Sequence, residues 1–355
     1  MNPHPRHLVV TLSGHGFGHA AMTAPLINLL GQRHPRLKIT LRSPAPRWFF
    51  DAYYRVPFDY CNEGSDFGMV MHDAFRVDLS ASADRYRHFH AHWHDHLRRE
   101  ESRLQDLGTD LLLSNIAYLP LQAARNLSIP AIAFCCLNWA DIYRHYFGDD
   151  AIYRTILGAY RGADLFIRPA PAMPMPTLKT RSVGPVASLS RNQSAEIRAR
   201  LGLASDTRLI LASLGGVATE LGVERWPALP RVHYLLPGPA VTSRPDLSTL
   251  EEAGVGFTDA LASSDLFITK PGYGAFSEAA CHAVPLLYAE REWPEQPWLV
   301  DWLKRHLPCA AISADALRQG RFTAPLQTLL ASNRPAPLAP SGIEQALNEI
   351  EKFLF

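Results

Sequence analysis

The sequence predicts an α/β protein of two domains, each with a parallel sheet covered by helices. Short runs rich in Val, Ile and Leu alternate with longer helical stretches, a pattern typical of parallel strands buried on both faces. The chain has 355 residues, more than one hydrophobic core usually holds. A proline-rich stretch at 169–185 separates two sets of apolar runs and predicts an extended connector.

Each domain is expected to contain its own set of strands. In the first domain, 1–183, we expect strands at 7–12, 37–42, 110–114, 131–135 and 164–168. In the second domain, 184–340, we expect strands at 208–214, 232–236, 265–269 and 285–289. The amphipathic segment 341–355 predicts a last helix that packs back on the first domain, with Ser341 as N-cap and Glu344 three residues later.

The composition excludes several classes of partner. With 35 basic and 34 acidic side chains the net charge is +1, which gives no electrostatic footprint for nucleic acid or a membrane surface. No apolar segment approaches the roughly 18 residues that span a bilayer, and the N-terminus lacks a signal-peptide pattern. We therefore expect a cytoplasmic protein with a small-molecule partner. The odd number of cysteines, five, without metal-type spacing argues against a disulfide framework.

The first expected strand leads into the stretch SGHGFGHA at 13–20. Glycines allow a sharp turn and a close approach of the backbone to a ligand, and histidines transfer protons near neutral pH. The spacing differs from the dinucleotide-binding pattern, because the third glycine follows the second by two residues and not three. An ordinary strand-to-helix turn is the alternative, but the two histidines favour a functional site.

Two loops of the second domain have the features of an anion site. The stretch SLGGVAT at 213–219 directly follows an expected strand, and its backbone N–H groups are suited to holding an anion. In KPGYGAFSE at 270–278, glycines turn the chain into a helix whose N-terminus favours a diphosphate. Glu278 is expected in about the first turn of that helix, where it either accepts hydrogen bonds from ribose hydroxyls or only complements the helix dipole.

A histidine-rich stretch and an aromatic group each allow a functional and a structural interpretation. The stretch HFHAHWHDH at 88–96 permits zinc pairs at i, i+4 spacing on a helix, but the charged residues around it indicate a solvated helix, and we expect no metal. The aromatic group 48–50 is expected to be a buried anchor rather than a sugar-binding lip. Trp139, beside the polar Asn138 and Asp141, is the better candidate for stacking on a sugar.

Several motifs in order along the chain carry a resemblance to a known family. The block 254–289 resembles the nucleotide-sugar half of MurG-like glycosyltransferases with two facing Rossmann-like domains, the GT-B fold. Most of the chain is more similar to the glycosyltransferase-like N-terminal region of plant L-arabinokinases. This similarity rests on SGHGFGHA, LNWADIY at 137–143, RPAPAMPMP at 168–176, KPGYGAFSEA at 270–279 and REWPEQPWL at 291–299. We expect no counterpart of the arabinokinases' kinase domain in these 355 residues, so the resemblance implies no sugar kinase activity for them.

The resemblance implies a role for each matching position. The residues implied on the donor side are Gly215, Gly216, Phe257, Lys270, Gly272, Tyr273, Gly274, Ser277, Glu278, Glu295 and Gln296. Those implied on the acceptor side are Gly14, Gly16, Phe17, Gly18, Ser114, Asn115, Asn138 and Trp139. His19 or His15 is expected to be the catalytic base, with Asp141 a weaker candidate. No metal or cofactor is required, because loop amides and a helix dipole neutralise the diphosphate of a nucleotide-sugar substrate such as a UDP-sugar.

Three functions agree with these residues. The first is an inverting, metal-independent glycosyltransferase that moves a sugar from a nucleotide-sugar to an acceptor hydroxyl. The second is a nucleotide-sugar epimerase or hydrolase on the same fold, which acts on the donor without an acceptor. The third is a noncatalytic sugar-nucleotide binding protein, and fold-level analogy does not choose among the three.

Overall fold

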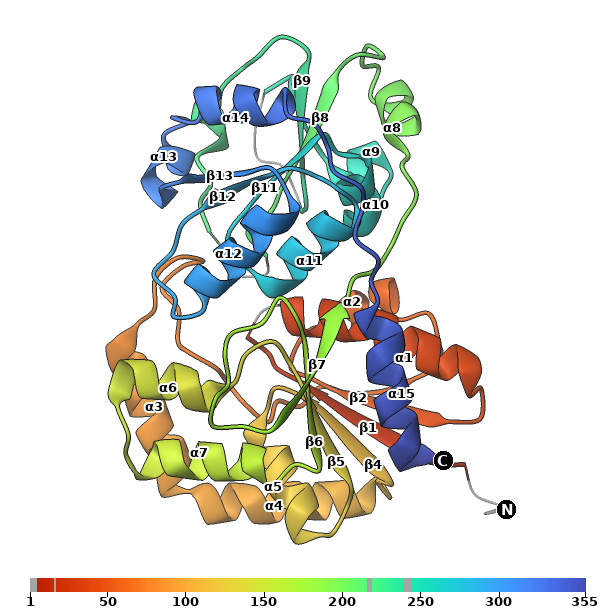
Figure 1. Ribbon diagram of the computed structural model, residues 1–355, viewed down its shortest axis with the longest axis vertical. Coiled ribbons are helices and arrows are strands. Elements are labelled where there is room, and N and C mark those ends of the chain that lie inside the picture. Colours follow the sequence, from red (N-terminus) through yellow and green to blue (C-terminus); the bar gives the residue numbers. More distant parts are fainter. Residues whose placement is uncertain (1–4, 16, 216–218, 239–243) are drawn as a thin grey trace. The chain divides into compact units, whose positions relative to one another are not determined.

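The computed structural model describes residues 5–15, 17–215, 219–238 and 244–355. The chain divides into two compact units (Figure 1). Unit 1 comprises Met1–His72, Val77–Val186 and Pro340–Phe355, and unit 2 comprises Asp73–Arg76 and Ala187–Ala339.

Unit 1 is built on a seven-stranded sheet in the order β3-β2-β1-β4-β5-β6-β7, in which every neighbouring pair is parallel. Its strands are β1 (His7–Leu12), β2 (Lys38–Arg42), β3 (Asp59–Cys61), β4 (Leu111–Asn115), β5 (Ala131–Phe134), β6 (Leu165–Ala170) and β7 (Thr180–Pro185). All residues of β1 and β4 are buried, which explains why these strands have continuous apolar runs without polar alternation.

The helices of unit 1 form two groups, with the sheet between them in Figure 1. One group packs around the first helix and contains α1 (Gly18–Arg33), α2 (Arg47–Tyr53) and α15 (Gly342–Leu354). The other contains α3 (Leu79–Ala91), α4 (Trp93–Asp106), α5 (Tyr118–Asn126), α6 (Trp139–Phe147) and α7 (Ala151–Arg161). The last helix, α15, contacts β7 and α1, and the Arg33 guanidinium donates to Glu344 at 2.6 Å.

Unit 2 is built on a six-stranded sheet in the order β10-β9-β8-β11-β12-β13, again with parallel neighbours throughout. Its strands are β8 (Arg208–Ala212), β9 (Val232–Leu236), β10 (Leu247–Thr249), β11 (Leu266–Thr269), β12 (Leu286–Ala289) and β13 (Cys309–Ile312). Its helices are α8 (Ser194–Arg200), the 3-10 helix η1 (Val223–Arg225), α9 (Leu250–Ala253), α10 (Phe257–Ser263), α11 (Tyr273–Cys281), α12 (Gln296–His306), α13 (Ala314–Arg318) and α14 (Thr323–Leu330). Two apolar clusters form its core, one centred on Tyr234 and Phe322, the other on Phe267 and Phe276. The predicted α/β class with two parallel sheets is confirmed.

In each sheet the strand order reverses once, between β1 and β4 in unit 1 and between β8 and β11 in unit 2. Ligands of open parallel sheets bind beyond the carboxyl ends of the strands at such a reversal, because the neighbouring loops diverge there. The stretch 13–19 follows β1, and the loops that begin at Ser213 and Lys270 follow β8 and β11. The glycine-rich loops singled out in the sequence therefore lie at these positions.

The structure corrects several sequence-based expectations. Part of the expected connector 169–185 is β7, which pairs with β6, so the proline-rich stretch ends in an edge strand. The side chain of Ser341 makes no capping hydrogen bond to α15. The histidine-rich stretch is two helices and not one, because α3 ends at Ala91 and α4 begins at Trp93. The short strands β3, β10 and β13 were not expected.

A four-residue segment from the first half of the chain, Asp73–Arg76, belongs to unit 2. Ala74 and Phe75 are buried in the cluster around Phe322, and the Arg318 guanidinium lies 5.3 Å from the centre of the Phe75 ring. The same guanidinium donates to the Asp73 carboxylate at 3.2 Å. Unit 2 thus completes its core with residues that lie more than a hundred positions earlier in the sequence.

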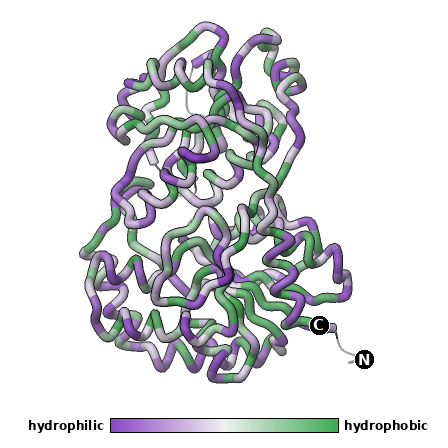
Figure 2. The backbone as a smooth tube through the Cα atoms, viewed as in Figure 1, coloured by the Kyte–Doolittle hydropathy of each residue, from purple (hydrophilic) through white to green (hydrophobic). Residues whose placement is uncertain are grey.

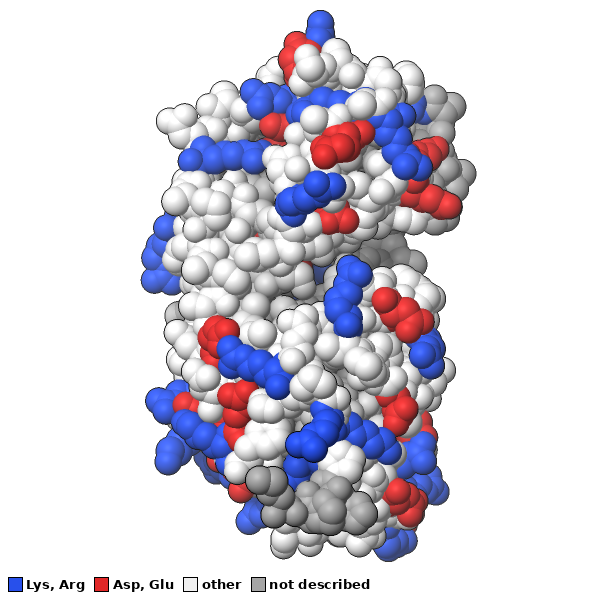
Figure 3. Space-filling model, turned by 90° about the vertical axis from the view of Figure 1, so that its right-hand side faces the viewer, with Lys and Arg blue, Asp and Glu red and all other residues white. Residues whose placement is uncertain are grey.

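Hydropathy and charge follow this division of core and surface. In Figure 2 the apolar residues concentrate along the strands, and polar residues mark the outer helices. On the face shown in Figure 3, Lys and Arg side chains are interspersed with Asp and Glu side chains over both units. Of the helices that the structure describes, none combines the length and apolar character needed to cross a membrane.

Candidate functional site

His19 lies in the first turn of α1, beside the carboxyl end of β4. Its Nδ1 atom is 3.0 Å from Oδ1 of Asn115, the last residue of β4. The Asn115 amide nitrogen donates to the Thr23 hydroxyl at 2.8 Å and to the His19 carbonyl at 3.2 Å. The glycine-rich loop and the end of β4, far apart in the sequence, thus meet in one hydrogen-bond network at the strand reversal of unit 1.

This network selects the tautomer of the His19 ring. The Asn115 amide nitrogen is used as a donor, so its oxygen faces Nδ1 and can only accept. Nδ1 therefore carries the proton, and the lone pair of Nε2 remains as the basic site. Burial lowers the pKa of His19, opposed by the hydrogen bond to Asn115, so the ring is neutral at pH 7. A neutral imidazole in a fixed tautomer is the form that a general base requires.

Asp66 is a further acidic group beside this cluster that the sequence reasoning missed. Its Oδ2 atom accepts a hydrogen bond from the Trp139 indole N–H at 2.9 Å. Burial raises the pKa of Asp66, while Trp139, the Ser13 hydroxyl and the charge of His19 favour the ionised form. A carboxylate here stabilises a positive charge that develops on the His19 ring. The only sequence signal is the short stretch GSDFG around it, which is weak by itself.

The loop that carries Asp66 packs closely on the glycine-rich loop. Gly68 has φ +62°, and a Cβ atom there would lie 2.7 Å from His15 Nδ1 and 2.8 Å from the Trp139 ring. The His15 ring contacts the Trp139 ring edge to face at 5.3 Å. Glycine at position 68 is therefore required for this loop to cover His15 and Trp139.

Several residues expected on the acceptor side have structural roles instead. Trp139 is 0% exposed, so its ring is not available to stack on a sugar, and the expectation is corrected on that point. Asn138 caps α6 by accepting from the Asp141 N–H, and its amide donates to the Asp141 carboxylate at 2.8 Å, so both side chains interact at the start of this helix. The buried Ser114 hydroxyl donates to the Ala117 carbonyl.

The remaining acceptor-side residues lie in and beside the glycine-rich loop. Gly14 and Gly18 are exposed, and Phe17 stacks on Phe49 at 4.6 Å between ring centres. Gly16 lies outside the described residues. Within the aromatic group 48–50, Phe49 and Phe50 are buried as expected, while Trp48 is 62% exposed.

In unit 2, Lys270 and the start of α11 lie together after β11. Gly272 is the N-cap of α11 and supplies no side chain to cap it, so no N-cap side chain satisfies the first N–H groups of the helix, an arrangement suited to an anion. A Cβ atom on Gly215, whose φ is +80°, would lie 4.0 Å from Lys270 Cε, which places the loop after β8 beside the Lys270 side chain. Burial and the nearby Arg291 lower the pKa of Lys270 to about 7. Gly216 lies outside the described residues.

Glu278 is a buried carboxyl in the second turn of α11, not in the first turn as expected. It is 6% exposed, and no side chain of the described residues donates a hydrogen bond to its carboxyl. Burial alone raises its pKa to about 8. The helix dipole acts only within the first turn, so it does not explain a buried acid at this position. An unpaired buried carboxyl beside a helix N-terminus is instead suited to receive hydrogen bonds from ligand hydroxyls.

The other donor-side residues fall into two sets. Tyr273 and Phe257 pack against the apolar cluster around Phe276, and Ser277 is buried within α11, with Gly274 in its first turn. Glu295 is 1% exposed and ion-paired with Arg291 at 3.6 Å, and the Gln296 side chain accepts from the Arg291 backbone N–H at 2.9 Å. The Glu295 carboxylate is thus buried beside Arg291, and its Oε2 atom makes no hydrogen bond to a described residue, so the expected contact with a donor sugar stays a prediction.

The histidines of the stretch 88–96 are divided between α3 and α4, and several of them contact other side chains. His90 is hydrogen-bonded to the Tyr118 hydroxyl at 3.0 Å, and burial lowers its pKa to about 4. The His88 and His92 rings are tilted toward one another with 4.8 Å between their centres, and His92 precedes the start of α4. Over the ranges that the structure describes, no group of three His, Cys, Asp or Glu side chains is placed to hold a metal ion.

Comparison with known proteins extends these observations. No family model matches the chain. The L-arabinokinase of Arabidopsis thaliana is 26% identical over 312 residues, which cover 84% of this chain but 30% of that protein. The chain thus corresponds to less than a third of this relative's length.

Solved structures resemble the chain over nearly its whole length. The calicheamicin glycosyltransferase CalG4 has a TM-score of 0.65 at 18% identity, covering 99% of this chain and 98% of that one. The glycotransferase of kitacinnamycin has a TM-score of 0.64 at 16% identity, covering 99% and 100%. A putative UDP-N-acetylglucosamine 2-epimerase from Listeria monocytogenes has a TM-score of 0.56 at 12% identity, covering 98% and 96%. The resemblance to L-arabinokinase and to glycosyltransferases of the GT-B fold is confirmed, and the fold of this chain is GT-B.

Proposed function

We propose that the protein is a glycosyltransferase that transfers a sugar from a nucleotide-sugar to an acceptor hydroxyl, with inversion and without a metal ion. In this proposal unit 2 holds the nucleotide and diphosphate, and unit 1 binds the acceptor and supplies the base. The observation that carries it is the neutral His19 ring with its Nδ1–H fixed by Asn115 at the strand reversal of unit 1. The GT-B fold and the unpaired Glu278 beside the α11 N-terminus support the same reaction.

The chemical step balances with the groups that the structure provides. Nε2 of His19 takes the proton of the acceptor hydroxyl, and the acceptor oxygen attacks the anomeric carbon of the sugar. The bond from that carbon to the diphosphate oxygen breaks, and the nucleoside diphosphate leaves with the electron pair. The Asp66 carboxylate stabilises the imidazolium while Asn115 holds its Nδ1–H.

The leaving diphosphate gains negative charge, so it requires fixed positive groups. The N–H groups at the start of α11, the helix dipole and the protonated Lys270 supply them in unit 2. Glu278 accepts hydrogen bonds from the ribose hydroxyls. These groups neutralise the charge of the diphosphate, as a divalent cation does in other diphosphate sites. The proposed reaction therefore includes no metal ion.

Replacing Glu278 by glutamine is expected to weaken nucleotide binding and to stabilise the fold. The substitution removes a carboxylate hydrogen bond, which weakens binding by about 10- to 100-fold. The pKa of Glu278 is raised from 4.5 to about 8 by folding, so the folded protein binds more protons and the free energy of unfolding falls as pH rises through this window. Glu278→Gln removes that loss, and its Tm gain is expected to be larger at pH 8 than at pH 5.

Calorimetric titration with the nucleoside diphosphate and thermal melts at both pH values test this prediction. Glu196→Gln, an exposed acid on α8, is the matched control and should change neither quantity. A Glu278→Gln variant that binds as tightly as wild type contradicts the assigned role.

Lys270 is expected to make nucleotide affinity depend on pH. Its pKa of about 7 means that it loses its charge in the free protein as pH rises above 7, and the diphosphate binds the charged form. The ratio of the wild-type Kd to the Lys270→Arg Kd should therefore rise by up to about tenfold per pH unit above 7, because arginine stays protonated. The ratio isolates this lysine, since Glu278 titrates equally in both proteins. A ratio that stays constant from pH 6 to 9 contradicts a contact between Lys270 and the diphosphate.

A nucleotide-sugar epimerase or hydrolase is the second candidate function, favoured by the likeness to the Listeria monocytogenes epimerase. Incubation with the nucleotide-sugar alone separates the two candidates. An epimerase or hydrolase rapidly forms an epimer or a stoichiometric amount of free sugar although no acceptor is present. Slow hydrolysis that an acceptor converts to transfer supports the transferase. Nucleotide binding with no turnover under any acceptor indicates the noncatalytic alternative.

A further inference from the structure

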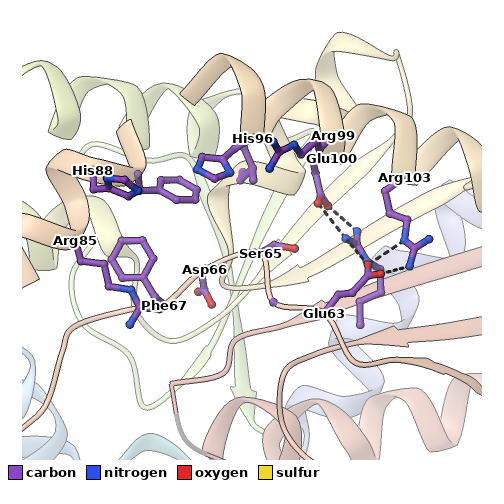
Figure 4. A pocket seen from close by; sticks show the side chains of 14 residues that line it. Glu63, Ser65, Asp66, Phe67, Arg85, His88, His96, Arg99, Glu100 and Arg103 are labelled. Carbon is purple, nitrogen blue, oxygen red and sulfur yellow. Dashed lines mark hydrogen bonds and ion pairs between the residues drawn. The ribbon is translucent and has the colours of Figure 1, made fainter. Parts of the chain in front are cut away.

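Unit 1 contains a pocket that none of the expected site residues line. Its volume is about 550 Å³, within the range of small-molecule sites. The pocket lies between the loop 63–67, the end of β2 and the facing sides of α3 and α4 (Figure 4). Asp66, which interacts with Trp139 and with the charge of His19, also lines this pocket. Through Asp66, the pocket therefore borders the group of side chains around His19.

The charges of the pocket do not balance. Its buried end holds an ion pair in which the Arg42 guanidinium donates to both Glu100 oxygens at 2.6 and 3.0 Å. Glu63 is bound by the Arg103 guanidinium and lies 3.6 Å from Arg42. Both glutamates are thus already paired with arginines.

Two arginines at the pocket rim have no such partner. Neither Arg85 nor Arg99 pairs with a carboxylate among the residues that the structure describes. Arg85 lies over the Phe67 ring at 4.6 Å. Arg99 and the His96 ring lie next to one another on the α4 wall, and burial, together with the charge of Arg99, lowers the pKa of His96. An anion placed at this wall would relieve the repulsion between the two groups.

Two polar atoms on the opposite loop also lack partners. The Ser65 hydroxyl and Asp66 Oδ1 are buried and make no hydrogen bond to any described residue. Figure 4 shows both residues on the loop across the pocket from His96 and Arg99. A buried carboxylate oxygen requires a hydrogen-bond donor, and a ligand hydroxyl supplies one. The pocket therefore offers cationic groups at one wall and an acceptor for a hydroxyl at the other.

We propose that this pocket binds the acceptor and selects a small hydroxylated anion, such as a sugar phosphate or a sugar acid. Its oxyanion lies at Arg99 and His96, and a hydroxyl donates to Asp66 Oδ1, the carboxylate beside the proposed base His19. The assignment of this ligand as the acceptor rests on the proposed function. Binding of the anion at the pocket does not, and it is measured without any nucleotide.

Calorimetric titrations of the whole chain with glucose 6-phosphate, glucuronate and glucose test the proposal. The two anions are expected to bind and neutral glucose is not, and the stronger of the two identifies phosphate or carboxylate as the anchor. Arg99→Gln should weaken anion binding by about 10- to 100-fold, the loss of a charge-assisted hydrogen bond. Arg98→Gln is the matched control, because the neighbouring Arg98 pairs with Asp95 and does not line the pocket. Ser65→Ala should weaken binding by a smaller factor.

Three outcomes overturn the proposal: glucose binds as tightly as the anions, no anion binds, or the Arg98→Gln and Arg99→Gln variants lose affinity equally. Both arginines are exposed, so either variant is expected to fold, and a thermal melt verifies it. Nucleotide binding to unit 2 is measured in a separate titration, in which wild type is compared with Glu278→Gln. A protein that binds nucleotide but no anion refutes the pocket assignment alone, whereas one that binds the anion but no nucleotide refutes the proposed function.

Discussion

The His19→Ala variant is expected to lose about 10²- to 10⁴-fold in the rate constant of sugar transfer, the usual contribution of a general base. The reason is that Nε2 of His19 is the basic atom left by the hydrogen bond between Nδ1 and Asn115. Nucleotide binding should stay unchanged, because the groups assigned to the nucleotide are in unit 2. Release of nucleoside diphosphate, with and without acceptor, measures the effect.

His15→Ala is the matched control for this loss. His15 lies on the same loop, but its ring contacts the buried Trp139, so its removal should affect packing more than the rate constant. Asn115→Ala should lower the rate constant less than His19→Ala and shift its pH profile, because the ring tautomer is no longer fixed. Transfer that survives in His19→Ala and disappears in His15→Ala would assign the base to His15.

The Glu100→Ala variant is expected to lose about 3–5 kcal/mol in the free energy of unfolding, because it leaves the buried Arg42 guanidinium without its main partner. Arg42 is 3% exposed and Glu100 is 7% exposed, so water reaches the pair only through the pocket that both residues line. The 3.6 Å contact between Arg42 and Glu63 remains and places the cost toward the lower end of that range. Urea denaturation followed by circular dichroism measures it.

Asp106→Ala, an exposed acid on the same helix, is the control and should change the unfolding free energy by no more than about 0.5 kcal/mol. Arg42→Met combined with Glu100→Leu should recover most of the loss, because replacing both members of a buried ion pair leaves no unpaired charge. A single Glu100→Ala variant as stable as wild type would show that this ion pair contributes nothing to unit 1.

The strands that could be predicted from the sequence are those with continuous apolar runs. β1, β4 and β9 are buried along their whole length, and hydrophobicity alone locates them. β3 and β10 have three residues each, too few to show a period. β7 contains Gly184 and Pro185 and lies at the sheet edge, where proline is tolerated, so its composition indicates a connector.

The site could be predicted where it depends on local chemistry. Glycine and histidine after β1, and glycines before α11, mark the ends of central strands by residue type alone. Asp66, Arg85 and Arg99 could not be found in this way, because only the packing of the 63–67 loop against α3 and α4 brings them together. The burial of Trp139 and Glu295 likewise depends on tertiary packing. Their residue types suit ligand contact, and the structure gives them internal partners instead.

Calorimetric titration of the purified chain with UDP, GDP, ADP and dTDP tests most directly whether unit 2 binds the nucleotide of a sugar donor. A ligand that binds the folded state also raises Tm, which gives an independent check on the same samples. At least one of these nucleotides is expected to bind, and Glu278→Gln should weaken this binding by about 10- to 100-fold while the Glu196→Gln control should not. If none of the four binds wild-type protein, unit 2 is not the nucleotide site of a glycosyltransferase, and the proposed function is contradicted.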